Sequence, residues 1–236
     1  WGQVQKYSTE IKAAAPDKLV GFSYFDAPSN VSSAQSNGLL ETFGSKLDFW
    51  GVNSFQGTTV TNSLAPYKAL GGASKPVIMT EFAVPATSHS VDESCDGDFP
   101  SQAGVNSIFA DSTTVAKAAT AMRNVLPVLL SDNVVAGAFY FEWNDEWWKQ
   151  DPKPGCYDTN KERQEGGVKA ALSQMPNGFN DEEGFGLHSI SLNGRAAGSL
   201  FSPFDKNAAT ANNRPDILTP RTELLEAVTE AFKPVR

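Results

Sequence analysis

Apolar residues along the chain follow two patterns in turn. Val4, Tyr7, Ile11 and Ala14 recur at spacings of three and four, which predicts an amphipathic helix that ends at Pro16. Short, nearly unbroken apolar runs follow, and such runs are typical of strands that are buried on both faces. Helices are predicted at about residues 2–15, 34–43, 64–70, 113–130 with a kink near Pro127, and 222–232, and strands at 19–25, 47–52, 76–80, 134–142 and, more briefly, 185–192.

Strands that alternate with helices indicate βαβ units, a parallel sheet and right-handed crossovers. Polar or aromatic residues stand at the end of each of the first four strands, namely Asp26, Asn53 with Gln56, Glu81, and Glu142 with Trp143. Placing chemical groups at the carboxyl ends of parallel strands is how a (β/α)8 barrel builds its active site. Because four strands cannot close a barrel, the sequence predicts an α/β fold in which residues 1–236 supply about strands five to eight of a (β/α)8 TIM barrel, with long loops at 85–106, 149–184 and 202–213.

Glu81 is the first candidate for chemistry, because it ends the apolar strand at 76–80. Burying an ionised carboxylate at the end of a core strand costs free energy unless the charge is paired or used. The alternative interpretation is a surface carboxylate that starts a loop or is paired in a salt bridge. Glu142, at the end of the fourth strand, has the same two interpretations.

The acidic composition narrows the class of partner. The formal net charge is −8 and the pI is near 4.8, and the basic residues form no run. Phosphate binding needs clustered Lys and Arg, so a nucleic-acid partner is not expected, and a neutral, sugar-like ligand suits the chain better. No apolar run approaches the roughly 18 residues that cross a bilayer, so no membrane span is expected. Trp1 opens directly into the helical pattern, which we interpret as a processed or truncated N-terminus.

Two cysteines, Cys95 and Cys156, lie in polar segments that are rich in Gly, Asp and Pro. In an oxidising compartment they would pair, whereas in a reducing one they would be idle thiols or half of a metal site. The sequon at Asn30 favours the first alternative. We therefore expect a secreted, extracellular or cell-wall protein with one disulfide between these cysteines and a glycan at Asn30.

Three stretches of the chain carry a resemblance to a known family. They are KPVIMTEF at 75–82, DFWGVNSFQG at 48–57, and AGAFYFEWNDEWW at 136–148 followed by FGLHSISLNGR at 185–195. Together they resemble strands seven, six and eight of the retaining β-glycosidases of glycoside hydrolase clan A, over roughly residues 1–200. Within this clan, the segments GVNSFQG at 51–57 and FYFEWND at 139–145 are also similar to the β-1,3-glucanosyltransferases of cell walls.

The resemblance implies an eight-stranded barrel with catalytic carboxylates at the ends of strands four and seven. Glu81 then corresponds to the nucleophile. The acid/base Glu is expected upstream of Trp1, on the same protein or on a second chain that carries strands one to four. Phe55 stands where the clan often has a Tyr that donates a hydrogen bond to the nucleophile, and Phe cannot donate.

A sugar ligand needs apolar faces and hydrogen-bonding groups around Glu81. Indole rings stack on pyranose faces, and amides meet hydroxyl groups. The expected substrate-binding residues are Asn53, Phe55, Gln56, Glu142, Trp143, Asn144 and Trp147. The amides could instead cap helices, and the Trp residues could pack in the core.

The expected function is that of a retaining β-glycoside hydrolase or transglycosylase that acts on a β-linked glucan-type polysaccharide. The alternative is a non-catalytic, sugar-binding or structural protein derived from the same barrel. His89 and His188 have no metal-ligand spacing and are interpreted as loop or packing residues. No nucleotide fingerprint or phosphate loop is present in the sequence, so neither a cofactor nor a metal is expected.

Overall fold

The structure is a computed structural model that describes residues 1–41, 46–70, 74–86, 112–144, 174–176, 184–191 and 217–233. The chain divides into two compact units. The first unit comprises Trp1–Ala83 and Asn124–Tyr140, and the second comprises Val84–Arg123 and Phe141–Arg236.

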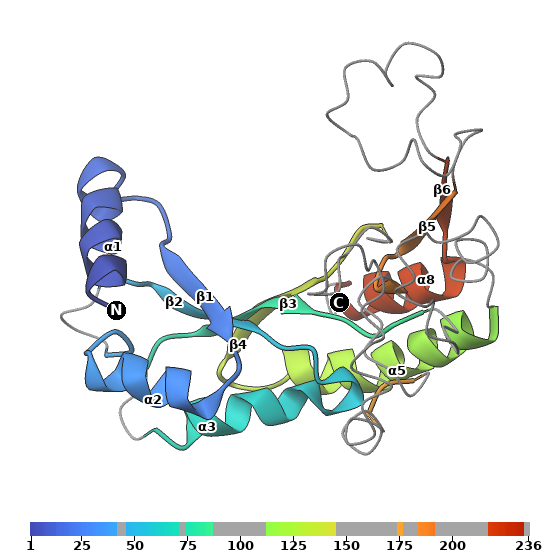
Figure 1. Ribbon diagram of the computed structural model, residues 1–236, viewed down its shortest axis with the longest axis horizontal. Helices are drawn as coiled ribbons and strands as arrows, with labels where there is room; N and C mark the ends of the chain where they lie inside the picture. The colour runs from blue at the N-terminus through green and yellow to red at the C-terminus, as the bar shows by residue number, and fades with distance from the viewer. Residues whose placement is uncertain are drawn as a thin grey trace, which may run out of the picture. The chain divides into compact units, whose positions relative to one another are not determined.

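Four parallel strands form the sheet of the first unit (Figure 1). A doubly wound sheet reverses its strand order at a switch point, whereas the strands of a (β/α)8 barrel lie side by side in chain order. The order here is β1-β2-β3-β4, which is the order of a barrel segment and confirms the predicted α/β class and parallel pairing. Which strands of a barrel these would be stays a prediction. The strands are β1 (Gly21–Phe25), β2 (Phe49–Asn53), β3 (Val77–Phe82) and β4 (Val135–Tyr140).

Helical segments precede or connect these strands, as the spacing of apolar residues predicts. The helices expected at 2–15, 64–70 and 113–130 are confirmed, and a 3-10 helix that the pattern did not predict precedes the second of them. Pro127 lies inside the longest helix, and the kink expected there stays a prediction. The segments are α1 (Gly2–Ala14), α2 (Pro28–Ser36), the 3-10 helix η1 (Gly57–Leu64), α3 (Ala65–Lys68) and α5 (Ser112–Leu130).

The prediction of a helix at about 34–43 is wrong in its position, because α2 begins at Pro28 and ends at Ser36. Pro suits the first turn of a helix, where its fixed φ is already helical and its missing N–H has no partner to lose. The helix ends because Gly38 takes a φ of 71°, a left-handed conformation that glycine adopts without a steric penalty. Residues 42–45 of the predicted span lie outside the described residues.

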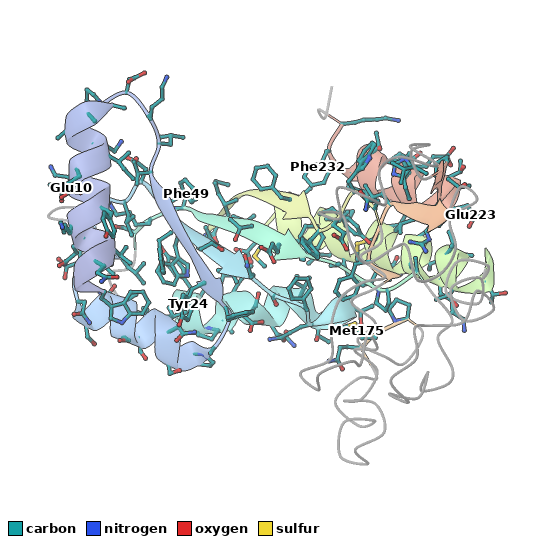
Figure 2. All side chains as sticks on the ribbon, turned by 45° about the horizontal axis from the view of Figure 1, so that its top comes forward. Glu10, Tyr24, Phe49, Met175, Glu223 and Phe232 are labelled. Carbon is teal, nitrogen blue, oxygen red and sulfur yellow. The ribbon has the colours of Figure 1, made fainter. Side chains whose placement is uncertain are left out.

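One face of the sheet carries an apolar core. Trp50, Val52, Val77 and Met79 are each at most 3% exposed. At the start of α1, the ring of Trp1 lies 6.1 Å from that of Trp50 and 5.9 Å from that of Tyr24, which is labelled in Figure 2. These contacts bury aromatic surface between the first helix and the sheet. Burial of apolar surface is the main way in which such side chains stabilise a fold.

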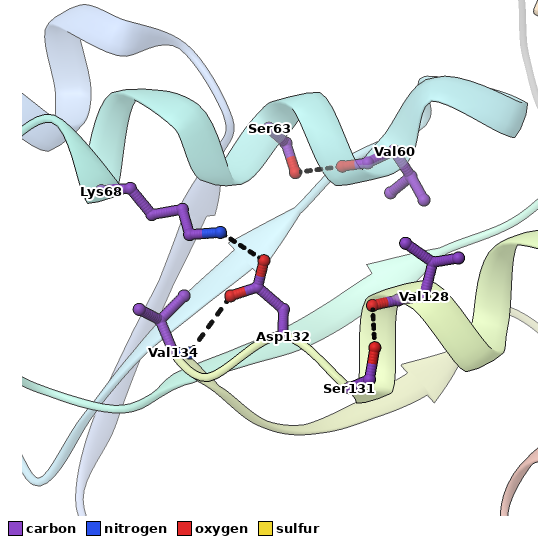
Figure 3. A network of polar contacts seen from close by, with 7 residues as sticks. All are labelled: Val60, Ser63, Lys68, Val128, Ser131, Asp132 and Val134. Carbon is purple, nitrogen blue, oxygen red and sulfur yellow. Dashed lines mark hydrogen bonds and ion pairs between the residues drawn. The ribbon is translucent and has the colours of Figure 1, made fainter.

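Ion pairs hold the amino-terminal edge of the sheet. Lys12 of α1 lies 2.6 Å from Asp48, just before β2, and the same carboxylate oxygen accepts a hydrogen bond from the backbone N–H of Val20. Lys68 of α3 pairs with Asp132, just before β4, as Figure 3 shows. The hydrogen bond from each lysine lowers the pKa of its carboxyl partner. The helices are therefore tied to the starts of the strands.

The second unit contains a small antiparallel sheet and a terminal helix. The sheet pairs β5 (His188–Ser191) with β6 (Ile217–Pro220), and α8 (Thr222–Ala231) follows. The expected strand at 185–192 and the expected helix at 222–232 are thus confirmed, while β6 was not predicted. Most of the long loops expected at 85–106 and 149–184, and all of 202–213, lie outside the described residues. In the described part of the chain, no helix is long and apolar enough to cross a membrane.

Candidate functional site

Strand β3 carries a bulge that changes the direction of Glu81. In the pairing with β2, Val52 lies opposite Met79 but Asn53 lies opposite Glu81, and in the pairing with β4, Ala138 lies opposite Met79 but Tyr140 lies opposite Phe82. Between Met79 and Phe82, β3 therefore has one extra residue, at Thr80 and Glu81, relative to both neighbours, whereas between Val77 and Ile78 the extra residue belongs to β4.

The bulge moves Glu81 off the buried face of the sheet. In a regular strand, Glu81 would share the face of Val77 and Met79, because side chains alternate with a period of two. Phe82 takes that place instead and is 1% exposed, and its ring packs edge-on against that of Tyr140 at 5.6 Å. Glu81 and Thr80 are both half-buried. The carboxylate thus belongs to the opposite face, in register with Asn53 at the carboxyl ends of the strands.

The face of the sheet opposite Val77 and Met79 is called the open face below. On it, Asn53 lies beside two hydroxyl groups. Its Oδ1 accepts hydrogen bonds from Ser23 Oγ at 2.7 Å and from Thr80 Oγ1 at 2.6 Å, and the two hydroxyl oxygens lie 2.6 Å apart. A Cβ built on Gly51 would lie 3.0 Å from Ser23 Cα and from Thr80 Cγ2, so the three strands approach one another closely here. Because the amide oxygen is occupied, the amide nitrogen of Asn53 is left to donate to a ligand.

Asp26, at the end of β1, organises the segment that follows β2. Its Oδ2 accepts hydrogen bonds from Ser54 Oγ and from Gln56 Nε2, both at 2.6 Å. Its backbone N–H donates to the carbonyl oxygen of Asn53 at 3.2 Å. Phe55 lies between the two side-chain donors and is half-buried. Its side chain has no polar group that could bind a ligand or Glu81.

The residues after β4 belong to the second unit and are held by the start of β5. The N–H of Leu187 donates to the carbonyl of Glu142 at 2.9 Å, and the N–H of His188 donates to the carbonyl of Trp143 at 3.0 Å. Asn144 forms a parallel bridge with His188. Glu142, Trp143 and Asn144 are therefore paired with the segment that leads into β5.

Trp143 presents an indole ring to solvent and is 60% exposed. Its ring lies 4.3 Å from the imidazole of His188 with the planes tilted by 38°, and His188 is 8% exposed. The prediction of His188 as a packing residue fits this contact. A ring that is held on one side and open on the other suits stacking on a sugar face.

Several predicted residues cannot be placed. Trp147, Cys95 and Cys156 lie outside the described residues, so the sugar contact of Trp147 and the disulfide stay predictions. Asn30 lies in the first turn of α2, where its Nδ2 donates to the carbonyl of Phe25 at 3.2 Å. Its glycosylation stays a prediction as well.

The sequence indicated only some of these site residues and few of their contacts. Asp26 stood out as a polar strand end, but its bonds to Ser54 and Gln56 cross 28 and 30 residues of chain and have no local signal. Ser23 and Thr80 sit inside apolar runs, and only their alternation with buried residues could have marked them as facing the other side of the sheet. Within the described ranges, no group of three His, Cys, Asp or Glu residues could hold a metal ion.

The open face offers a carboxylate beside oriented amide and hydroxyl groups. Such a set can attack or stabilise a positively charged carbon and can hydrogen-bond a polyhydroxylated ligand. Nucleophilic attack by Glu81 requires a second group that protonates the leaving oxygen.

No protein-family model and no curated protein sequence matches the chain. Among solved structures, it is similar to a β-glucuronidase from Bacteroides uniformis (TM-score 0.41, 13% identity, 61% of this chain and 15% of that one). It is also similar to an exo-β-agarase (TM-score 0.46, 14% identity, 98% and 22%) and to the catalytic core of xylanase A (TM-score 0.44, 12% identity, 64% and 47%). The chain spans less than half the length of each of these proteins. Membership of clan A therefore stays a prediction.

Proposed function

We propose that this chain supplies the nucleophile-bearing half of a retaining β-glycosidase or transglycosidase barrel that acts on a β-glucan-type polysaccharide. The observation that carries the proposal is the bulge in β3, which turns Glu81 from the buried face to the open face at the carboxyl ends of the strands. Bulges are frequent next to active sites, where they redirect a side chain. The carboxyl ends of parallel strands are also where barrel enzymes keep their catalytic groups.

In the proposed reaction, the Glu81 carboxylate attacks the anomeric carbon and forms a covalent glycosyl ester. The glycosidic bond breaks, and the leaving oxygen takes a proton from an acid/base carboxyl expected upstream of Trp1. In the second step, the same group removes a proton from water or from a sugar hydroxyl, which then displaces Glu81. A retaining pair of this kind stands about 5–5.5 Å apart.

The predicted substrate-binding residues would contact the sugar. The Asn53 amide nitrogen donates to a hydroxyl, since its oxygen is held by Ser23 and Thr80. The exposed Trp143 ring stacks on a pyranose face, with Asn144 beside it. Gln56, Phe55, Glu142 and Trp147 complete the proposed set. A disulfide between Cys95 and Cys156 and a glycan at Asn30 would suit a secreted or cell-wall setting.

The test uses the full-length protein. Glu81→Gln keeps the shape of the side chain but removes the charge, so turnover on soluble β-glucan should fall by at least about 10³-fold while binding of the same glucan is kept. Glu230→Gln, an exposed carboxylate on α8, is the matched control and should turn over normally. Incubation with a 2-deoxy-2-fluoro-β-glucosyl fluoride, followed by peptide mass spectrometry, should find the sugar on Glu81.

A label on another residue, or full turnover in Glu81→Gln, would overturn the nucleophile assignment. The second candidate function is sugar binding without catalysis. The lack of a donor at Phe55 and the exposed ring of Trp143 favour it. Wild-type protein that binds β-glucan but neither cleaves it nor accepts the fluorosugar label would establish this alternative.

A further inference from the structure

We infer that Asp26 is a positioning residue that holds the bulge of β3, and with it Glu81, in place; this inference rests on the proposed function. The connection runs through Ser54, which is 1% exposed. Ser54 donates its hydroxyl to Asp26 Oδ2 at 2.6 Å, and its backbone N–H donates to the carbonyl oxygen of Glu81 at 2.9 Å. Asp26 thus reaches the bulged residue by way of a single intervening residue.

Asp26 holds the segment after β2 at three points. Its carboxylate accepts from the side chains of Ser54 and Gln56, and its backbone N–H donates to the carbonyl of Asn53. Both side-chain bonds end on the same oxygen, and hydrogen bonds to an ionised carboxylate are roughly twice as strong as neutral ones. Ser54 is therefore fixed in the orientation that lets its N–H meet the Glu81 carbonyl.

Two simpler roles for Asp26 do not fit the contacts. A polar residue just before a helix often caps it, but α2 begins after Ala27 and receives no side-chain capping hydrogen bond. A carboxylate at a strand end often forms a salt bridge, but the described partners of Asp26 are a hydroxyl and an amide. The side-chain hydrogen bonds of Asp26 join the end of β1 to the segment after β2, and β2 is the neighbour of β3, which carries Glu81.

The bulge is the element that depends on this support. Phe82 takes the place of Glu81 on the buried face because β3 has one extra residue between Met79 and Phe82. The bond between the Ser54 N–H and the Glu81 carbonyl lies next to that extra residue. A small displacement of a reacting group can cost a large factor in rate, up to about 10²-fold for 1 Å. Loosening Ser54 should therefore lower the rate of attack by Glu81 more than it weakens sugar binding.

The experiment compares Asp26→Asn, Ser54→Ala and the double variant in the full-length protein. The Asn side chain has the same shape but lacks the charge, and Ala at position 54 keeps the backbone N–H while removing the hydroxyl. Each single variant should lower kcat on β-glucan by about tenfold, with KM within about twofold of wild type. Because Asp26 acts through Ser54, the double variant should lose no more than the worse single variant. Asp17→Asn, the same charge change at an exposed turn, is the control and should leave kcat unchanged.

Labelling of Glu81 by the fluorosugar should slow in the same proportion as kcat in the Asp26 and Ser54 variants. Additive losses in the double variant, or equal kcat values for Asp26→Asn and Asp17→Asn, would overturn the inference. If Asp26→Asn does not fold, Ser54→Ala decides the matter by its labelling rate. Failure of the proposed function gives a different result, because Glu81 itself then takes no label and tolerates replacement by Gln.

Discussion

Gly51 offers a direct test of how closely the strands approach one another beneath the candidate site. We expect Gly51→Ala to destabilise the protein because the new methyl group has no room. A Cβ at this position would lie 3.0 Å from Ser23 Cα and from Thr80 Cγ2, and 3.1 Å from the carbonyl oxygen of Phe22. Two of these three contacts are with backbone atoms, which cannot rotate away.

Gly137 of β4 is a matched control in the same sheet. A Cβ built there meets no heavy atom within 4 Å. Either replacement of Gly by Ala restricts the unfolded chain and so stabilises by about 0.4–1 kcal/mol where the backbone allows it. Overpacking costs about 1–3 kcal/mol. Because the two variants share the first effect, the difference between them isolates the second, and Gly51→Ala should be less stable than Gly137→Ala by about 1–3 kcal/mol.

Thermal and urea unfolding of both variants in the full-length protein measure this difference. For a chain of this size, about 1 kcal/mol corresponds to a shift of roughly 2–4 °C, so Gly51→Ala should melt about 2–12 °C below Gly137→Ala. Equal midpoints would refute the close approach of β1, β2 and β3 at Gly51. Turnover should also fall in Gly51→Ala alone, since Ser23 and Thr80 would move apart and release the Asn53 oxygen.

Two further predictions concern stability against pH. Burial raises the pKa of Tyr67 to about 12, so the folded state keeps this proton where the unfolded chain loses it, and stability should fall as pH rises from about 10 through 12. Tyr67→Phe should lower the free energy of unfolding by about 1 kcal/mol at neutral pH, because the hydrogen bond to the Lys75 carbonyl is lost. The variant should not show the fall in stability above about pH 10. If the urea midpoints of variant and wild type are identical at every pH, this prediction is contradicted. The hydrogen bond from Lys68 lowers the pKa of Asp132, so the stability that this pair contributes is present above the ordinary carboxyl pKa of 3.8 and is lost as pH falls through the folded pKa. Asp132→Asn should cost about 0.2–1 kcal/mol at pH 7 and should differ less from wild type at pH 2; a gap that widens in acid would rule out this assignment.

The alternation of helices and strands could be predicted because it depends on local residue patterns. The apolar spacing of α1 and the unbroken runs of β1 to β4 carry their own periodicity. The start of α2 was missed, although Pro28 is a common first residue of a helix. Strand β6 was missed because it is short and is stabilised by pairing with β5, whose residues lie about 30 positions earlier in the chain.

The direction of Glu81 could not be predicted from the sequence of β3. Alternation from Val77 and Met79 places Glu81 on the buried face, whereas the paired strands place Phe82 there. The bulge is decided by register with β2 and β4, and these contacts span more than twenty residues of chain. Burial of an aromatic ring outweighs burial of a carboxylate, which explains why the strand accepts the extra residue.

The two edges of the sheet have different roles: contacts at the amino-terminal edge stabilise the fold, and the carboxyl edge carries the proposed chemistry. At the amino-terminal edge, Asp48 and Asp132 are paired with lysines, and neutralised carboxylates of this kind hold helices to strands. At the carboxyl edge, the described side-chain partners of Asp26 are the neutral donors Ser54 and Gln56. Substitutions at the lysine pairs should therefore change unfolding midpoints and leave kcat unaltered, whereas Asp26→Asn should lower kcat. A (β/α)8 barrel separates these two properties in the same way, since its lower edge supports the fold and its upper edge carries the reaction.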